Sequence, residues 1–210
     1  MTPDKTIKAA SLPIAPMQMA SGRVVDLGNL KPDNVYWPDL LEGLVKLPRF
    51  NGATAHVTYT TAQHCCLMHD RAEDVHKPWA LLADFYCAYF GEISRSFRHF
   101  AAHLSGDPQA FLESYYLARD EVTATIWEAA GLSEKGESDT ASLDRAAYLG
   151  QLDKRLTASE RRDLMASSRE AQDHWHLPEP FPIPVKAWGE DKARAELALR
   201  LKMIGIYLRN

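Results

Sequence analysis

Apolar side chains recur every three or four residues along most of this 210-residue chain, and no other feature constrains its fold as strongly. The clearest example spans 108–131, where Asp107-Pro108 supplies an N-cap and a residue suited to the first helical turn. One apolar stripe then runs to the closing Gly131 and consists of Phe111, Tyr115, Ala118, Val122, Ile126 and Ala129. This pattern predicts a helix with one face packed against a core.

The same signals predict further helices. Thr60 and Gln63 have the spacing of a capping box, so a helix is expected to begin there and to run towards Asp74. Apolar spacing and flanking prolines predict the others over 38–47, 78–90, 142–168 and 189–208. Strand-like sequence is confined to a short hint at Val24 and Val25. The expected fold class is therefore all-α, a helical bundle.

Prolines indicate where the helical domain begins and where its last helix is set apart. Pro3, Pro13 and Pro16 interrupt any helix near the start, so residues 1–21 are expected to form an N-terminal arm. Residues 22–210 then form one helical domain. Four prolines within 177–185 predict an extended connector, which leads into the last helix.

Composition excludes several classes of protein. The net charge of −4 argues against an extended nucleic-acid surface. No apolar run approaches the roughly 18 residues of a membrane span, and the first residues lack the apolar core of a signal peptide. Three cysteines, two of them adjacent, do not form a disulfide framework. We therefore expect a cytoplasmic protein without membrane contact.

Three polar residues stand out against this helical background. Asp84 lies inside the apolar run ALLADFYCAYF, where a carboxylate is costly unless it is paired or bound to a metal. His64 follows a helix cap, and Asp153 lies on a later helix. Each has a structural alternative: Asp84 could pair with an arginine, His64 could form a structural hydrogen bond, and Asp153 could be solvated. Because the three belong to different predicted helices, they could also converge on a metal ion in the bundle.

Several short motifs resemble those of the HD-domain phosphohydrolases, in particular the short phage and bacterial branch that contains nucleotidases. The resemblance covers about residues 22–203. Each fragment alone is weak, but their order and spacing together are fairly specific. The fragments are Arg49-Phe50-Asn51-Gly52, Tyr59-Thr60-Thr61-Ala62-Gln63-His64, Ala80-Leu81-Leu82-Ala83-Asp84, Ala88-Tyr89-Phe90-Gly91-Glu92-Ile93, Asp153, and Glu160-Arg161-Arg162-Asp163-Leu164-Met165.

The resemblance implies a metal site. His64 matches the family's first metal ligand, Asp84 matches the aspartate of the His-Asp pair, and Asp153 matches the distant aspartate. The implied cofactor is Mn²⁺, Fe²⁺, Co²⁺ or Mg²⁺. The literal pair His69-Asp70 lies in a polar stretch and is interpreted as solvated surface.

The resemblance also implies roles around the metal. Arg49 matches an arginine that holds substrate phosphate, and Asn51 and Gln63, from the same two motifs, are assigned to substrate binding. Glu92 matches a second carboxylate and is assigned with Asp84 to catalysis. The implied substrate is a nucleotide, and the family implies a homo-oligomer.

Three departures from the family pattern leave the activity open. The loop after Asn51-Gly52 continues with Ala53, where many relatives have a histidine. Ala83 replaces the histidine of the His-Asp pair, and Cys87 replaces a glutamate that assists the attacking water. One hypothesis is a metal-dependent phosphohydrolase of (deoxy)nucleotides with an incomplete ligand set. The alternative is a pseudoenzyme without bound metal, which binds a nucleotide or a protein partner. A third hypothesis is different chemistry in the same pocket.

Overall fold

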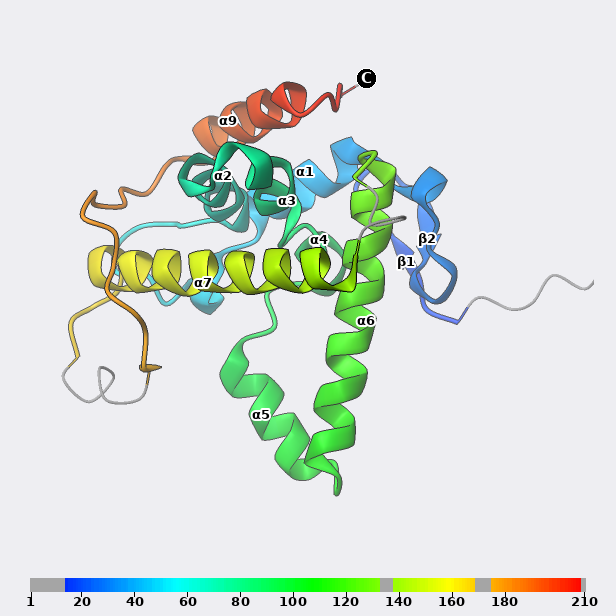
Figure 1. Cartoon of the computed structure of the whole chain (residues 1–210), viewed down its shortest axis with the longest axis horizontal. Helices are drawn as coiled ribbons and strands as arrows, with labels where there is room; N and C mark the ends of the chain where they lie inside the picture. Colours follow the sequence, from blue (N-terminus) through cyan, green and yellow to red (C-terminus); the bar gives the residue numbers. More distant parts are fainter. Residues whose placement is uncertain (1–13, 133–137, 169–174, 209–210) are drawn as a thin grey trace, which may run out of the picture.

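A computed structural model describes residues 14–132, 138–168 and 175–208 of the chain. These residues form a mainly helical structure with one small antiparallel sheet, so the all-α prediction is confirmed at the level of fold class (Figure 1). The strands are β1 (Pro16–Gln18) and β2 (Val24–Asp26). The helices are α1 (Trp37–Lys46), α2 (Thr61–Arg71), α3 (Lys77–Leu82), α4 (Cys87–Phe90), α5 (Arg95–Leu104), α6 (Pro108–Ala129), α7 (Asp139–Leu164) and α9 (Glu190–Met203).

The predicted caps begin their helices. The Thr60 hydroxyl accepts a hydrogen bond from the Gln63 amide at 3.3 Å and starts α2. The Asp107 carboxylate accepts one from the Ala110 amide at 3.0 Å and starts α6. Each cap satisfies a backbone donor that has no partner within the helix, which stabilises the helix start by about 1 kcal/mol.

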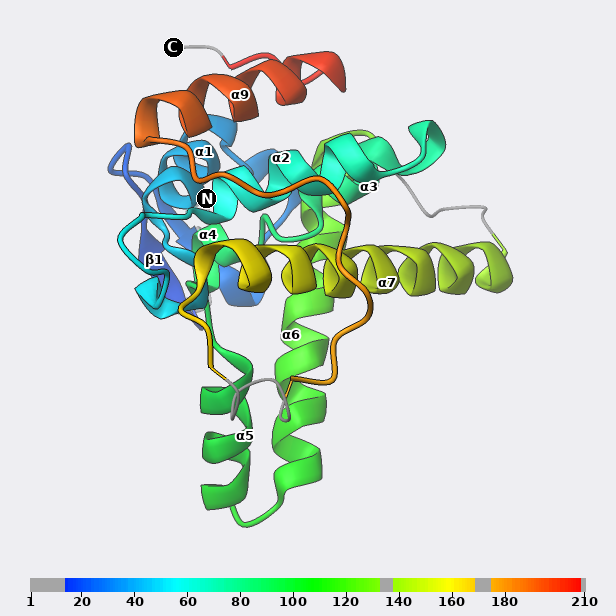
Figure 2. The same cartoon turned by 90° about the vertical axis from the view of Figure 1, so that its left-hand side faces the viewer.

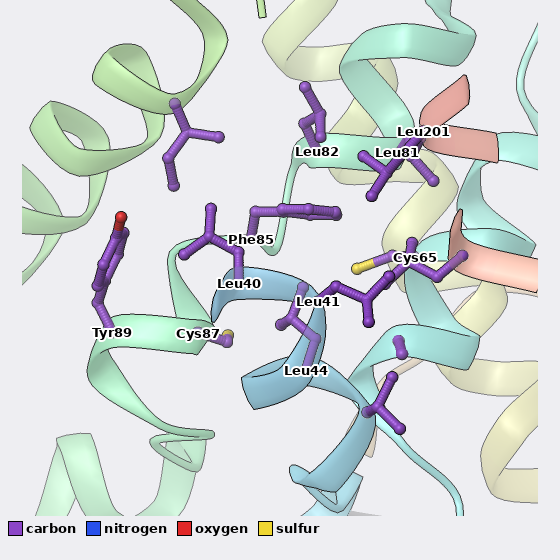
Figure 3. Packing of buried hydrophobic residues seen from close by; sticks show 14 of the residues in the cluster. Leu40, Leu41, Leu44, Cys65, Leu81, Leu82, Phe85, Cys87, Tyr89 and Leu201 are labelled. Atoms are coloured by element: carbon purple, nitrogen blue, oxygen red, sulfur yellow. The ribbon is translucent and has the colours of Figure 1, made fainter. Parts of the chain in front are cut away.

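Helix α2 lies at the centre of the packing. It contacts α1, α3, α7 and α9, so its side chains are buried from several directions. Figure 3 shows the main core at close range, with leucines of α1 facing Phe85 and residues of α2, α3 and α9. A second cluster of buried side chains lies between α2 and α7 and includes Tyr59, Met68, Leu149 and Leu156. Helix α2, which carries His64, therefore packs against a buried cluster on each of two sides.

The prediction of one continuous helix over 78–90 is wrong, because the helix is interrupted in its middle. Helix α3 ends at Leu82 and α4 begins at Cys87. Between them the backbone bonds span three residues, from Phe85 to Leu82 at 3.2 Å and from Cys87 to Asp84 at 3.1 Å. This tighter winding turns successive side chains by about 120°. Phe85 is thereby fully buried, while the Asp84 carboxylate is 21% exposed and lies 3.0 Å from His64 Nε2.

Other boundaries also differ from the predictions. Residues 16–18, assigned to the arm, form β1 and pair with β2, while residues 1–13 lie outside the described part of the chain. Helix α7 begins at Asp139 and ends at Leu164 rather than spanning 142–168. Helix α9 ends at Met203, because Gly205 adopts a φ of +88° and the chain turns back. Residues 177–185 form neither helix nor strand.

Helix α5 is not among the predicted helices. It pairs with the first half of α6, and the two project from the body of the molecule as a helical hairpin (Figures 1 and 2). Phe97, Phe100 and Leu104 on α5 are each more than half exposed. An apolar face that meets no core gives helix formation less support than the faces of α1 or α6.

Within the described residues, no helix combines the length and the apolar character needed to cross a membrane. Cys65, Cys66 and Cys87 are buried free thiols.

An ion pair joins α9 to α2, and its contribution to stability depends on pH. Arg200 donates to both oxygens of Asp70 at 2.8 and 2.6 Å. Partial burial raises the pKa of Asp70, but hydrogen bonds from His69 and Arg200 lower it more, to about 2. The lowered pKa means that this carboxylate stabilises the fold above about pH 4, and that the contribution disappears as the pH falls towards 2.

We therefore expect Asp70→Asn to reduce the free energy of unfolding by at most about 1 kcal/mol at pH 7, since the pair is partly exposed. The difference from the unmodified chain should shrink below pH 4. Urea denaturation at several pH values measures both quantities, with Asp144→Asn on the exposed surface of α7 as the control. A difference that stays constant with pH would contradict the assignment.

Candidate metal centre

Three side chains from separate parts of the sequence meet between α2 and α7. His64 comes from α2, Asp84 from the turn after α3, and Asp153 from the middle of α7. His64 Nε2 lies 3.0 Å from Asp84 Oδ2 and 3.4 Å from Asp153 Oδ1. One ligand atom from each residue lies within 4.8 Å of the others. The structure thus brings together the three residues that the sequence predicts as metal ligands.

The orientation of His64 suits a metal ligand. The imidazole is completely buried, and its Nδ1 lies 2.5 Å from Glu160 Oε1. Among the described residues, no group meets His64 Nε2 in hydrogen-bond geometry, although two carboxylate oxygens lie nearby. A buried ring nitrogen that faces two carboxylates without a hydrogen bond fits an ion between them.

Arg49 lies at the edge of this group. Its backbone N–H donates to the Tyr59 carbonyl at 2.8 Å. The next three residues, Phe50, Asn51 and Gly52, all have φ between +53° and +77°, which is unusual for the first two because they carry side chains. Strained backbone of this kind gathers at functional sites, where the surrounding structure maintains it.

The Arg49 guanidinium is surrounded by acidic groups. Its side chain is 9% exposed, and four carboxylates lie between 3.4 and 4.0 Å from its terminal nitrogens. These carboxylates belong to Asp84, Glu92, Asp153 and Glu160. We call these four residues, together with Arg49 and His64, the carboxylate cluster.

The carboxylate cluster has an excess of negative charge. Four carboxylates face one guanidinium and one imidazole, so the net charge is −2 even when His64 is protonated. Buried charge of one sign is costly, and a divalent cation would balance it. The charge balance therefore favours a cation in the cluster.

The pKa values in the cluster reflect its charges. Burial and Arg49 lower the pKa of His64, but the surrounding carboxylates, first among them Glu160, hold it well above its usual value. Burial raises the pKa of Asp84, but the nearby His64 imidazole, followed by the Arg49 guanidinium, lowers it to about 2. Without an ion the imidazole therefore carries a proton, which a metal has to displace.

Glu92 borders the cluster from the loop after α4. Its Oε2 accepts a hydrogen bond from the Thr61 hydroxyl at 3.3 Å, and its Oε1 lies 3.6 Å from Arg49 Nη1. The side chain is 19% exposed. Asp153 is 46% exposed. Solvent therefore reaches the cluster at both of these carboxylates.

Two predicted substrate-binding residues are not brought to the cluster. The Gln63 side chain donates to the Lys186 carbonyl at 2.8 Å and accepts from the Trp188 amide at 2.7 Å. Adjacent residues on a helix point about 100° apart, so Gln63 meets the connector while His64 meets the carboxylates. Asn51 is exposed in the left-handed turn.

The positions where the sequence differs from the motifs that it resembles contribute no ligand. Ala83 lies next to Asp84 in the turn and offers only a methyl group. Cys87 is buried in the core that Figure 3 displays, and burial raises the pKa of its thiol well above the usual value. The interpretation of His69 as solvated surface is wrong, because its side chain is buried, with Nδ1 3.1 Å from Asp70.

Sequence reasoning missed Glu160 and Tyr59 as site residues. Glu160 is completely buried on α7, and the Tyr59 hydroxyl donates to its Oε1 at 2.5 Å. A signal was present, because Glu160 follows Asp153 by seven residues and so lies two turns further along the same helix face. An acidic residue at that spacing, on a face otherwise marked by Leu156 and Leu164, belongs with the candidate site residues.

No protein-family model matches the chain, and no curated protein matches its sequence.

Proposed function

We propose that the chain binds one divalent metal ion at His64, Asp84 and Asp153 and hydrolyses a phosphoester of a (deoxy)nucleotide. The observation that carries the proposal is the convergence of one imidazole nitrogen and two carboxylate oxygens within 4.8 Å from three separate elements. One nitrogen and two oxygens suit Mn²⁺, Fe²⁺, Co²⁺ or Mg²⁺. The nucleotide is proposed on the resemblance to the HD-domain phosphohydrolases.

A bound divalent ion would polarise the phosphoryl group and lower the pKa of water. Arg49 can hold the phosphate, because its carboxylate contacts of 3.4 to 4.0 Å are loose and its buried Nε has no partner among the described residues. Glu92 can accept a proton, since it is partly exposed and anchored by Thr61. These roles need no residue beyond those already gathered in the cluster.

The charge of the cluster predicts an order of binding. A phosphate approaching the metal-free cluster meets four carboxylates, so it should be repelled until a divalent cation is bound. We expect calorimetry to show one Mn²⁺ per chain, and inorganic phosphate to bind only after that ion. A panel of nucleoside mono- and triphosphates should be hydrolysed with Mn²⁺ and spared with excess chelator. Phosphate binding to the metal-free chain, or hydrolysis that survives chelation, would contradict the proposal.

A second candidate function is a pseudoenzyme that binds a nucleotide or a protein partner without turnover. The observations that favour it are the methyl group of Ala83 beside Asp84 and the buried neutral thiol of Cys87. Both positions have lost the polar group that the resemblance would place there. The same assay separates the candidates, because a pseudoenzyme would bind the nucleotide and release no product.

The resemblance also leads us to propose a homo-oligomer in the cytoplasm. The buried free thiols agree with a reducing compartment.

A further inference from the structure

Glu160 is a fully buried carboxylate for which the proposed reaction gives no role. It lies on α7, between the core cluster that contains Tyr59 and the group of proposed metal ligands. An ionised carboxylate without solvent costs several kcal/mol unless every lone pair finds a partner. Its position therefore calls for an explanation from its contacts.

The two oxygens of Glu160 serve different partners. Oε1 receives the Tyr59 hydroxyl at 2.5 Å and lies 2.5 Å from His64 Nδ1. Oε2 lies 3.4 Å from Arg49 Nη2. One carboxylate thus contacts both a proposed metal ligand and the proposed phosphate-binding guanidinium.

We propose that Glu160 is the positioning residue that joins the metal site to the phosphate site. This inference rests on the proposed function. By accepting the Nδ1 proton of His64, Oε1 fixes the ring orientation and leaves the Nε2 lone pair directed at the ion. Oε2 makes no hydrogen bond among the described residues, but at 3.4 Å its charge attracts the Arg49 guanidinium towards the oxygens of Asp84 and Asp153.

Tyr59 supports this arrangement from the core side. Its ring is completely buried, and its hydroxyl donates to the oxygen that also contacts His64. A carboxylate that accepts two short hydrogen bonds on one oxygen cannot rotate without breaking both. Loss of the Tyr59 hydroxyl should therefore loosen Glu160 without removing its charge.

This arrangement would compensate for the absence of a second ligating histidine, since position 83 is an alanine. A carboxylate behind a ligating imidazole makes the ring a better donor, and loss of such a partner costs about 10- to 100-fold in metal affinity. With one imidazole in the ligand set instead of two, the remaining one depends more heavily on its partner. Glu160 is therefore expected to affect metal binding although it does not touch the ion.

The experiment compares Glu160→Gln, Tyr59→Phe and the exposed control Asp144→Asn in the full chain. We expect Glu160→Gln to raise the Kd for Mn²⁺ by about 10- to 100-fold and Tyr59→Phe to raise it less. At saturating Mn²⁺, Glu160→Gln should also weaken inorganic phosphate binding, since Arg49 loses the ionic contact that positions its guanidinium. Asp144→Asn should change neither value.

A purely structural role for Glu160 would lower stability without changing the ligands of the ion. Pulsed electron paramagnetic resonance of bound Mn²⁺ detects the nitrogen of a coordinated imidazole, and this signal should weaken in Glu160→Gln. Tyr59→Phe provides the test if Glu160→Gln does not fold.

Two failures are distinguishable. If the unmodified chain binds no Mn²⁺, the proposed function is wrong and this inference falls with it. If the unmodified chain binds Mn²⁺ and both variants keep its affinity and its nitrogen signal, only the positioning role is overturned.

Discussion

Asp84→Asn is expected to abolish stoichiometric Mn²⁺ binding and nucleotide hydrolysis together. The amide keeps the shape of the side chain but removes the negative charge that lies 3.0 Å from His64 Nε2. Loss of a direct anionic ligand should cost more than the roughly 100-fold that loss of an outer partner costs in metal affinity. Elemental analysis of chelator-treated and reloaded protein measures the metal, and phosphate release from nucleotides measures the activity.

Asp144→Asn is the matched control, because it makes the same chemical change on an exposed position of α7. It should retain the ion and the activity. Asp84→Asn protein that still holds one Mn²⁺ per chain would show that the ion binds elsewhere. Protein that loses the ion while hydrolysis continues would separate the metal site from the activity.

The second large effect concerns the residue after Asp84. We expect Phe85→Ala to reduce the free energy of unfolding by about 3–5 kcal/mol, because it removes a completely buried ring and leaves a cavity. The ring packs edge to face against Trp37, with 6.2 Å between the ring centres. Urea denaturation monitored by circular dichroism measures the loss.

Phe100→Ala is the control, since that ring is 59% exposed on α5 and should change stability by less than about 0.5 kcal/mol. Phe85→Ala should also weaken Mn²⁺ binding, because the buried ring fixes the turn that aims Asp84. Equal stability of the two variants would mean that the turn is not anchored by Phe85.

Much of the site can be predicted from the sequence, because its proposed ligands are polar residues at positions that the local pattern would assign to the core. Asp84 interrupts an apolar run, and His64 follows directly on a capping box. Such conflicts are expected at functional sites. The resemblance added Arg49 and Glu92, and the structure places both beside the predicted ligands.

The remainder depends on tertiary geometry. Gln63 and His64 are neighbours in sequence, yet the direction of each side chain follows from how α2 is rotated between the connector and α7. Glu160 lies in a charged stretch that, taken locally, indicates a solvated helix face. Its burial follows from the packing of α7 on Tyr59, which is 101 residues away in sequence. No local pattern contains that contact.

The packing of α9 has a consequence for synthesis of the chain. Helix α9 packs on α1 and α2 (Figures 1 and 2). Its residues Ala193, Leu197 and Leu201 are fully buried. Helix α9 is the last of the described helices to leave the ribosome. Until then the nascent chain exposes the apolar sides of α1 and α2 that α9 will cover, and such surface is prone to aggregation. The core is therefore completed only once α9 has emerged, and a chaperone that shields apolar segments should raise the yield of the native protein.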